Sequence, residues 1–334
     1  MDLTGRKLGK YQIVKRLGRG GMAMVYEGYQ PDLERHVAIK VLHKHLAADP
    51  DFVERFRREA RAMGQLQHRN LVRLIDFDID NDQYYMVMEF IEGGTLGDYL
   101  KKKAPLPAEE ALYIMGQLTD ALGYAHDRGM IHRDIKPANI MFMAENGSHA
   151  VLMDFGLARI LGEDGMTVTG QMIGTPAYMS LEAVQGDKVD KRTDIYSLGV
   201  VLYEMLTGRT PYIANTPYKM ILKQLHDPLP PPRQVYPALP EAVEQVVLKA
   251  LAKEPNERYQ SAQQFYQAIE QTRAALNANQ PLGLPPATTS PRPKVRPKNN
   301  SPAPEQNQWM RFAVAVGGVL LIVVLMMALL SALA

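Results

Sequence analysis

The stretch IHRDIKPANI at residues 131–140 is followed by the short segment DFG at residues 154–156. Moving a terminal phosphoryl group requires a carboxylate that accepts a hydroxyl proton, a cation that offsets phosphate charge, and oxygen ligands for Mg²⁺. These chemical types are supplied by Asp134, Lys136, Asn139 and Asp154. The two segments therefore predict a site that handles phosphate together with a divalent cation.

A glycine-rich stretch, LGRGGMAMV at residues 17–25, lies upstream of this site. Glycines let backbone N–H groups approach a phosphate without a side chain in the way. Strand-like sequence lies on both sides, YQIVKRL before it and VYEGY after it. The stretch therefore predicts a strand–turn–strand lid rather than the strand–turn–helix of a dinucleotide site. An ordinary hairpin turn is the alternative.

A lysine ends the apolar strand-like run VAIK at residues 37–40. Burying such a charge is costly unless it has a partner, and a bound phosphate together with a carboxylate would supply one. The candidate carboxylate is Glu59, in a helical stretch near residues 51–67. The alternatives are that Lys40 faces solvent on an edge strand and that the helix carries only surface pairs such as Glu54–Arg58.

Composition limits the class of protein. The chain has 334 residues, 46% of them hydrophobic, and no cysteine, which excludes disulfides and cysteine-based metal sites. Five of the 38 basic residues and one of the 36 acidic residues follow Pro281. Residues 1–280 are therefore slightly acidic, and the residues that follow are basic. A weakly acidic body argues against nucleic acid as a partner.

Taken in order, the glycine loop, VAIK, Glu59, HRDIKPAN, DFG and the later DIYSLGV resemble a protein kinase. More closely, the chain resembles a bacterial membrane-bound serine/threonine kinase of the eukaryotic-like, Hanks type, over about residues 11–270. The resemblance implies an α+β fold with two lobes and ATP in the cleft between them. The small lobe, residues 1–92, would carry an antiparallel sheet and the larger lobe, residues 93–275, would be mostly helical.

The resemblance also implies roles for single residues, with ATP and Mg²⁺ as the small-molecule requirements. Lys40 would contact the α- and β-phosphates and pair with Glu59, Asp134 would act as base, and Lys136 would steady the γ-phosphate. The expected metal ligands are Asn139 and Asp154. The expected ATP-binding positions are Leu17, Gly18, Gly20, Val25, Ala38, Lys40, Met88, Glu89, Ile91 and Met141.

Control of activity is expected in the segment between DFG and Glu182. Thr167 and Thr169 resemble autophosphorylated threonines, whose phosphates Arg133 would bind, and Thr175 resembles the threonine that contacts the catalytic loop. The resemblance further implies that Glu182 pairs with Arg258 and that Asp194 braces the catalytic loop. This chain departs from the family pattern in two places, which are Ala23 for the third lid glycine and Ser180-Leu181 for Ala-Pro.

The C-terminal part is expected to reach a membrane. Residues 276–309 are expected to form a basic, proline-rich linker, because eight prolines lie from Pro281 to Pro304. Residues 310–334 are expected to form one transmembrane helix, because the last 23 residues carry no charge. The positive-inside rule then places the kinase domain in the cytoplasm and the C-terminus at the outer face. A folded cap and a buried core helix are the alternatives for these two segments.

The sequence therefore predicts a non-specific serine/threonine protein kinase in signal transduction, with autophosphorylation of its activation loop. Protein substrates, self-association through the kinase domain and membrane lipid are the expected partners. A membrane-tethered pseudokinase scaffold is the alternative, although Lys40, Asp134, Asn139 and Asp154 are all present. A small-molecule kinase of related fold is a third reading, which the peptide-substrate-like GTPAYM at residues 174–179 opposes.

Overall fold

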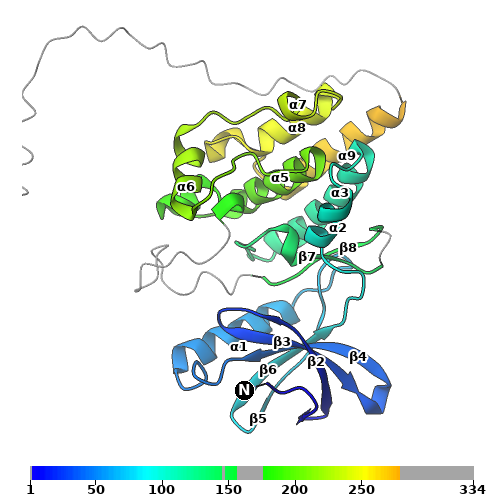
Figure 1. Cartoon of the computed structure of the whole chain (residues 1–334), viewed down its shortest axis with the longest axis vertical. Coiled ribbons are helices and arrows are strands. Elements are labelled where there is room, and N and C mark those ends of the chain that lie inside the picture. Colours follow the sequence, from blue (N-terminus) through cyan, green and yellow to red (C-terminus); the bar gives the residue numbers. More distant parts are fainter. Residues whose placement is uncertain (1, 145–146, 156–175, 279–334) are drawn as a thin grey trace, which may run out of the picture. The chain divides into compact units, whose positions relative to one another are not determined.

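The computed structural model describes residues 2–144, 147–155 and 176–278, which fold into a small sheet lobe and a larger helical lobe (Figure 1). The small lobe is built from the following elements: β1 (Lys7–Leu8), β2 (Tyr11–Arg19), β3 (Ala23–Gln30), η1 (Pro31–Leu33), β4 (Arg35–Leu42), α1 (Pro50–Gly64), β5 (Leu74–Asp80) and β6 (Gln83–Glu89). The strands form one six-stranded sheet in the order β1-β2-β3-β4-β6-β5, with every neighbouring pair antiparallel.

Strand β4 lies inside this sheet and is buried on both faces. Val37, Ile39 and Val41 point into an outer cluster of apolar and tyrosine side chains. Ala38 and Leu42 point into a second cluster beneath α1. Because side chains alternate along a strand, Lys40 belongs to the α1 face, so the period-2 pattern already aims its ammonium at that helix.

Helix α1 begins where the sequence provides a cap. The Asp49 side chain accepts a hydrogen bond from the backbone N–H of Asp51, and Pro50 opens the first turn without needing a donor. Phe56, Ala60 and Met63 are buried against the sheet. Glu59 shares this buried face, which brings a carboxylate to the sheet beside the lysine of β4.

The described part of the larger lobe consists of helices and the short hairpin of β7 and β8 (Figure 1). Its elements are α2 (Leu96–Lys103), α3 (Ala108–His126), η2 (Pro137–Asn139), β7 (Ile140–Phe142), β8 (Ala150–Leu152), η4 (Pro176–Tyr178), α4 (Leu181–Gln185), α5 (Lys191–Thr207), α6 (Pro217–His226), α7 (Pro232–Val235), α8 (Glu241–Ala250), η5 (Pro255–Glu257) and α9 (Ala262–Ala278).

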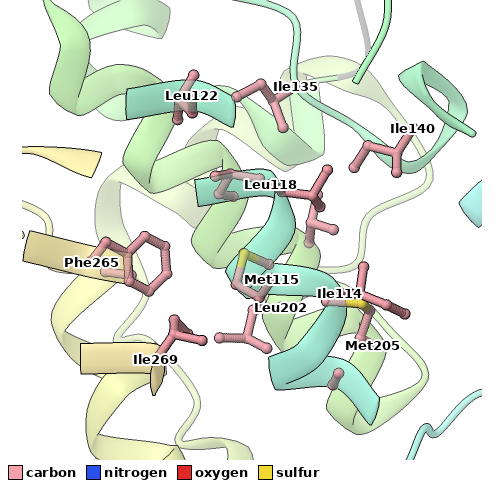
Figure 2. Close-up of a cluster of buried hydrophobic side chains, with 14 of the residues drawn as sticks. Ile114, Met115, Leu118, Leu122, Ile135, Ile140, Leu202, Met205, Phe265 and Ile269 are labelled. Carbon is pink, nitrogen blue, oxygen red and sulfur yellow. The ribbon is translucent and has the colours of Figure 1, made fainter. Parts of the chain in front are cut away.

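The core of the larger lobe lies where α3, α5 and α9 meet, as Figure 2 shows. Leu118 of α3, Leu202 of α5 and Phe265 of α9 have no exposed surface. Ile135 and Ile140, from the segment that carries the expected catalytic residues, pack into the same cluster. Because protein interiors are close-packed, these two buried side chains restrict the motion of the segment between them.

Asn70 ties the two lobes together just before β5. Its amide donates to the carbonyl of Ala150 at 2.7 Å and to Gln117 at 2.9 Å, while its own carbonyl accepts from the N–H of Leu152. Val72 donates to the carbonyl of Leu152. The hairpin that leads to DFG is therefore hydrogen-bonded to the chain that connects α1 with β5.

The expected two-lobed α+β fold is confirmed. The helix expected near residues 51–67 ends at Gly64, and α9 continues to Ala278, beyond the expected boundary at 275. Most of the expected linker and the whole expected transmembrane segment lie outside the described residues. Among the residues that are described, no helix is both long and apolar enough to cross a membrane.

Candidate active site

The first group in the site is an ammonium held between two carboxylates. Lys40 Nζ lies 2.8 Å from Asp154 Oδ1 and 3.4 Å from Glu59 Oε1. The three residues come from β4, from α1 and from the segment after β8, so two lobes contribute to one cluster. Glu59 Oε2 is buried and has no hydrogen-bond partner within the described residues, which leaves one oxygen able to accept a further donor.

Burial and charge shift the pKa values of this cluster. Burial by itself lowers the pKa of Lys40, but Asp154 and Glu59 outweigh it and raise that pKa above its usual value. Lys40 lowers the pKa of Asp154, which therefore stays ionised. Burial raises the pKa of Glu59 to about 7, against the lowering effect of Lys40. The Lys40 ammonium is therefore charged. Of its two carboxylate partners, Asp154 is the one whose pKa is lowered, so it is the ionised partner.

The second group is centred on Asp134. Lys136 Nζ donates to both carboxylate oxygens, at 3.0 and 2.7 Å. The Asn139 amide donates to Asp134 Oδ2 at 2.9 Å and to the Asp134 carbonyl at 2.8 Å. Asp134 is partly exposed, with 24% of its side chain accessible. It is an oriented hydrogen-bond acceptor that solvent or a substrate can reach.

A buried aspartate of α5 fixes the backbone that carries this loop. Asp194 has no exposed surface and accepts hydrogen bonds from the N–H groups of His132 and Arg133, at 2.8 and 2.7 Å. His126 Nε2 adds a third contact to it at 2.8 Å. Arg133 has a left-handed φ of 66°, a strained conformation for a residue with a side chain. The expected brace by Asp194 is confirmed, and it holds that strained turn.

Asp154 is positioned through its neighbours. It also has a positive φ, 55°. The carbonyl of the preceding Met153 contacts His132 Nε2 at 2.7 Å, and the Met153 N–H donates to the Asn139 carbonyl at 2.9 Å. The rings of His132 and Phe155 lie 4.7 Å apart. These contacts join the segment before Asp154 to the catalytic loop, so the two groups of the site are held together. The expected metal ligands Asn139 and Asp154 come from these two adjacent segments.

Only some of the expected ATP-binding residues lie in one cluster. Ala38, Met88, Ile91 and Met141 contribute to one apolar cluster beneath the sheet. Leu17, near the end of β2, is 45% exposed and is not among the residues of that cluster. Val25, on β3, is half-buried and likewise lies outside the cluster.

The chain after β6 offers polar backbone atoms beside this cluster. The N–H of Glu89 is already bonded to the carbonyl of Arg73. The N–H of Ile91, just beyond β6, has no hydrogen-bond partner within the residues described. A donor next to an apolar cluster suits the edge of a purine base, so this segment supports the expected backbone contacts from Glu89 and Ile91.

The glycine-rich turn joins β2 and β3, as expected. Its ends are closed by a hydrogen bond from the Gly20 N–H to the Ala23 carbonyl at 2.8 Å. A Cβ added at Gly18 or Gly21 would meet no protein atom within 4 Å, so these glycines leave open space. Ala23 is buried and pairs with Leu42 as an ordinary strand residue. Its methyl group is therefore accommodated within the strand.

The segment around Glu182 keeps its ion pair despite the unusual residues before it. Arg258 is buried and donates to both oxygens of Glu182, at 2.7 and 2.9 Å, which confirms the expected partner. Thr193 also donates to Glu182, at 2.8 Å. Gly156, Thr167, Thr169 and Thr175 lie outside the described residues.

Next to Lys136 and Tyr178 there is a hollow of about 560 Å³, lined partly by α2.

The site fits a nucleotide triphosphate with Mg²⁺. A charged lysine, an open glycine turn and an unpaired backbone donor beside an apolar cluster match phosphates and a base. Asn139 and Asp154 supply hard oxygen ligands. Within the described ranges, no three His, Asp or Glu side chains form a metal cluster by themselves. A bound Mg²⁺ would therefore complete its coordination with phosphate and water oxygens, which is its usual habit.

Sequence reasoning missed two supporting residues. His132 was not assigned a role, although its ring nitrogens contact the Met153 carbonyl and the Asp134 N–H. His126 was also missed, because its partner Asp194 is far away in the sequence. The placement of both histidines close to the catalytic loop was the only available signal, and it does not identify a partner.

Comparisons with known proteins agree with this geometry. The family described as "Protein kinase domain" matches residues 11–269. Serine/threonine-protein kinase Pkn1 of Myxococcus xanthus is 40% identical over 291 residues, covering 84% of this chain and 42% of that protein. Serine/threonine-protein kinase PrkC of Bacillus subtilis is 41% identical over 262 residues, covering 78% and 40%. The chain thus spans about two fifths of the length of these relatives.

Solved structures show the same fold. The kinase domain of PknI from Mycobacterium tuberculosis superposes with a TM-score of 0.63 at 29% identity, covering 81% of this chain and 100% of that one. Rad53, crystallised in complex with AMP-PNP, gives a TM-score of 0.66 at 25% identity, covering 78% and 65%.

The raised pKa of Glu59 predicts a pH-dependent stability. A carboxyl whose pKa is about 7 in the folded chain, against an ordinary value of 4.5, stabilises the fold fully below about pH 4.5, and this stabilisation is lost as pH rises through 7. Relative to Glu59→Gln, the native chain should lose at most about 3 kcal/mol of unfolding free energy between pH 5 and 8. Urea unfolding at several pH values measures this. Glu54→Gln, on the exposed side of α1, is the control, and a flat difference for Glu59→Gln would contradict the assignment.

Replacing Leu181 with proline is expected to increase the stability of the fold. It occupies the first turn of α4, where its N–H has no partner within the described part of the chain, and Ser180 has the extended φ of −73° and ψ of 162° that a following proline requires. Leu181→Pro should raise the unfolding free energy by about 0.4–1 kcal/mol. Val184→Pro, which removes a hydrogen bond to the Ser180 carbonyl, should instead cost about 3 kcal/mol. A loss of stability in Leu181→Pro as large as that control's would contradict the interpretation.

Proposed function

The chain belongs to the protein kinase family, and we propose that it transfers the γ-phosphoryl group of ATP to serine and threonine hydroxyls of proteins. One observation carries this proposal. Lys40 Nζ, 2.8 Å from Asp154, lies in the same frame as Asp134, which Lys136 and Asn139 orient. A scaffold that had lost catalysis would not need a base held by two donors, and this disfavours the pseudokinase alternative.

The chemistry follows from what each side chain can hold. The Lys40 ammonium offsets the charge of the α- and β-phosphates, with Glu59 as its second partner. The substrate hydroxyl oxygen bonds to the γ-phosphorus, the bond from that phosphorus to the bridging oxygen breaks, and Asp134 takes the hydroxyl proton. Lys136, already 2.7 Å from Asp134, offsets charge on the transferred group. Mg²⁺ held by Asn139 and Asp154 would supply charge neutralisation at the phosphates.

Several findings support the choice of substrate. The relatives are named serine/threonine-protein kinases, and AMP-PNP bound to Rad53 is an ATP analogue. The hollow beside Lys136 gives a polypeptide room to approach Asp134. Leu17, Gly18, Gly20, Val25, Ala38, Met88, Glu89, Ile91 and Met141 are the remaining positions proposed to bind ATP.

We further propose a membrane-anchored, single-pass arrangement. It rests on the uncharged residues 312–334 and the basic, proline-rich residues before them. Residues 276–309 would act as the linker, the kinase domain would be cytoplasmic, and basic side chains would contact anionic lipid. Flotation of the full chain with lipid vesicles tests this. A chain cut after Ala278 should stay in the bottom fraction, and flotation of both forms alike would contradict the assignment.

Phosphate transfer is tested directly with the full chain, labelled ATP and Mg²⁺. Asp134→Asn should lower incorporation of label by about 100-fold or more, because a positioned base contributes that much. Asp82→Asn, in the exposed turn between β5 and β6, is the control and should retain activity. Label equally present or absent in all three proteins would contradict kinase catalysis at Asp134, and label on tyrosine would contradict the specificity.

Autophosphorylation of Thr167 and Thr169 is proposed to activate the chain, because a phosphothreonine would gain charge-assisted bonds from Arg133. The double variant Thr167→Ala/Thr169→Ala should be less active by about tenfold or more. Self-association through the kinase domain would make this modification intermolecular. The initial rate per molecule should then rise with protein concentration. Unchanged activity in the double variant would contradict the first statement, and a rate independent of concentration the second.

A further inference from the structure

His43, just after β4, holds the glycine-rich turn at two points. Its backbone N–H donates to the carbonyl of Met22 at 2.9 Å. Its ring nitrogen Nε2 lies 3.0 Å from the carbonyl of Gly20. A carbonyl can only accept, so the ring must donate this hydrogen bond. Gly20 and Met22 flank the tip of the turn, and one residue therefore fixes both sides of it.

The ring itself is supported by a neighbour. The imidazoles of His43 and His45 are stacked, with centroids 5.5 Å apart and 16° between the planes. Stacking restricts the orientation of the His43 ring and so the direction in which Nε2 donates. Within the described residues, His45 makes no hydrogen bond to the turn, so it supports the His43 ring without holding the backbone itself.

Peptide planarity converts this anchor into an orientation of N–H groups. In a trans peptide the carbonyl of one residue and the N–H of the next point in opposite directions. When His43 holds the Gly20 carbonyl, the Gly21 N–H is directed away from the imidazole. The N–H groups of Gly21 and Met22 have no hydrogen-bond partner within the described residues, so they are available to an acceptor.

The alternation of β4 indicates which side that acceptor occupies. The hydrogen bond from His43 to Met22 continues the pairing of Ala23 with Leu42 one residue beyond β4, which gives His43 the parity of Val41 on the outer face. Lys40 has the opposite parity and reaches Asp154. A carbonyl turned toward His43 therefore leaves the Gly21 N–H directed toward the side of the sheet that carries the Lys40 ammonium. Two unpaired donors and one cation on that side match an oligophosphate.

We propose that His43 is a positioning residue that orients the backbone donors of the glycine-rich turn toward the phosphates of the nucleotide. The inference rests on the proposed function, because it assumes that ATP occupies the site. It assigns no direct contact between His43 and the nucleotide. Its effect should consequently depend on the phosphates and not on the base, and that is what distinguishes it from a role in folding.

The experiment compares the affinities of the full chain for Mg·ADP and for adenosine by calorimetry. His43→Phe keeps an aromatic ring that can stack on His45 but cannot donate, whereas His43→Gln keeps an N–H donor at a similar reach. Loss of one hydrogen bond should weaken binding of ADP by about three- to tenfold in His43→Phe and leave adenosine unchanged. His43→Gln should recover most of the loss, and His45→Ala, which removes the stacked ring but keeps the donor, should weaken ADP binding less than His43→Phe does.

Each outcome decides between the readings. Equal ADP affinity in His43→Phe and the native chain would overturn the proposal, as would an equal loss for ADP and adenosine, which indicates a merely structural role. A His43→Gln variant as weak as His43→Phe would also overturn it. If the native chain binds adenosine and ADP equally well, the site does not recognise phosphates and the proposed function fails with it.

Discussion

A buried ammonium that must be paired is the constraint on which the rest of this structure depends. Lys40 lies in the buried part of β4, where the side chains on either side of it are apolar, and only 10% of its own side chain is exposed. An isolated charge there would cost several kcal/mol, so carboxylates have to reach it. Glu59 comes from α1 and Asp154 from the larger lobe. Satisfying one lysine therefore brings together the parts of the chain that form the site.

Two further buried charges stabilise the larger lobe around that point. Asp194 is wholly buried and collects three donors, two of them backbone N–H groups of the loop that carries Asp134. Arg258 is buried against Glu182 and the carbonyls of nearby loops. Removing one partner of such a pair leaves an uncompensated charge, which is far more costly than the pair is favourable. A change that removes either partner of these buried pairs should therefore destabilise the loops of the site strongly.

The sequence predicted the site better than it predicted the contacts that support it. The apolar run VAIK predicted a buried Lys40, and the segment HRDIKPAN predicted one site for Asp134, Lys136 and Asn139. These are local relationships, which a pattern of neighbours can express. The contacts of Asn70 with Ala150, of His126 with Asp194 and of His43 with Gly20 join residues that are distant in sequence. No local pattern encodes such partners. The role of Leu17 at the nucleotide stays a prediction, because its exposed side chain has no contact in the structure that would test it within the described residues.

The most direct test of the account is an experimental structure of the chain with Mg²⁺ and AMP-PNP. The account predicts that the triphosphate lies against the Lys40 ammonium, beneath the turn at Gly20–Ala23, with the metal ion on Asn139 and Asp154. Lys40 should then keep Glu59 as its carboxylate partner while phosphate oxygens replace its 2.8 Å contact with Asp154. A nucleotide bound elsewhere, or a Lys40–Asp154 pair that persists with no phosphate near it, would contradict the central claim.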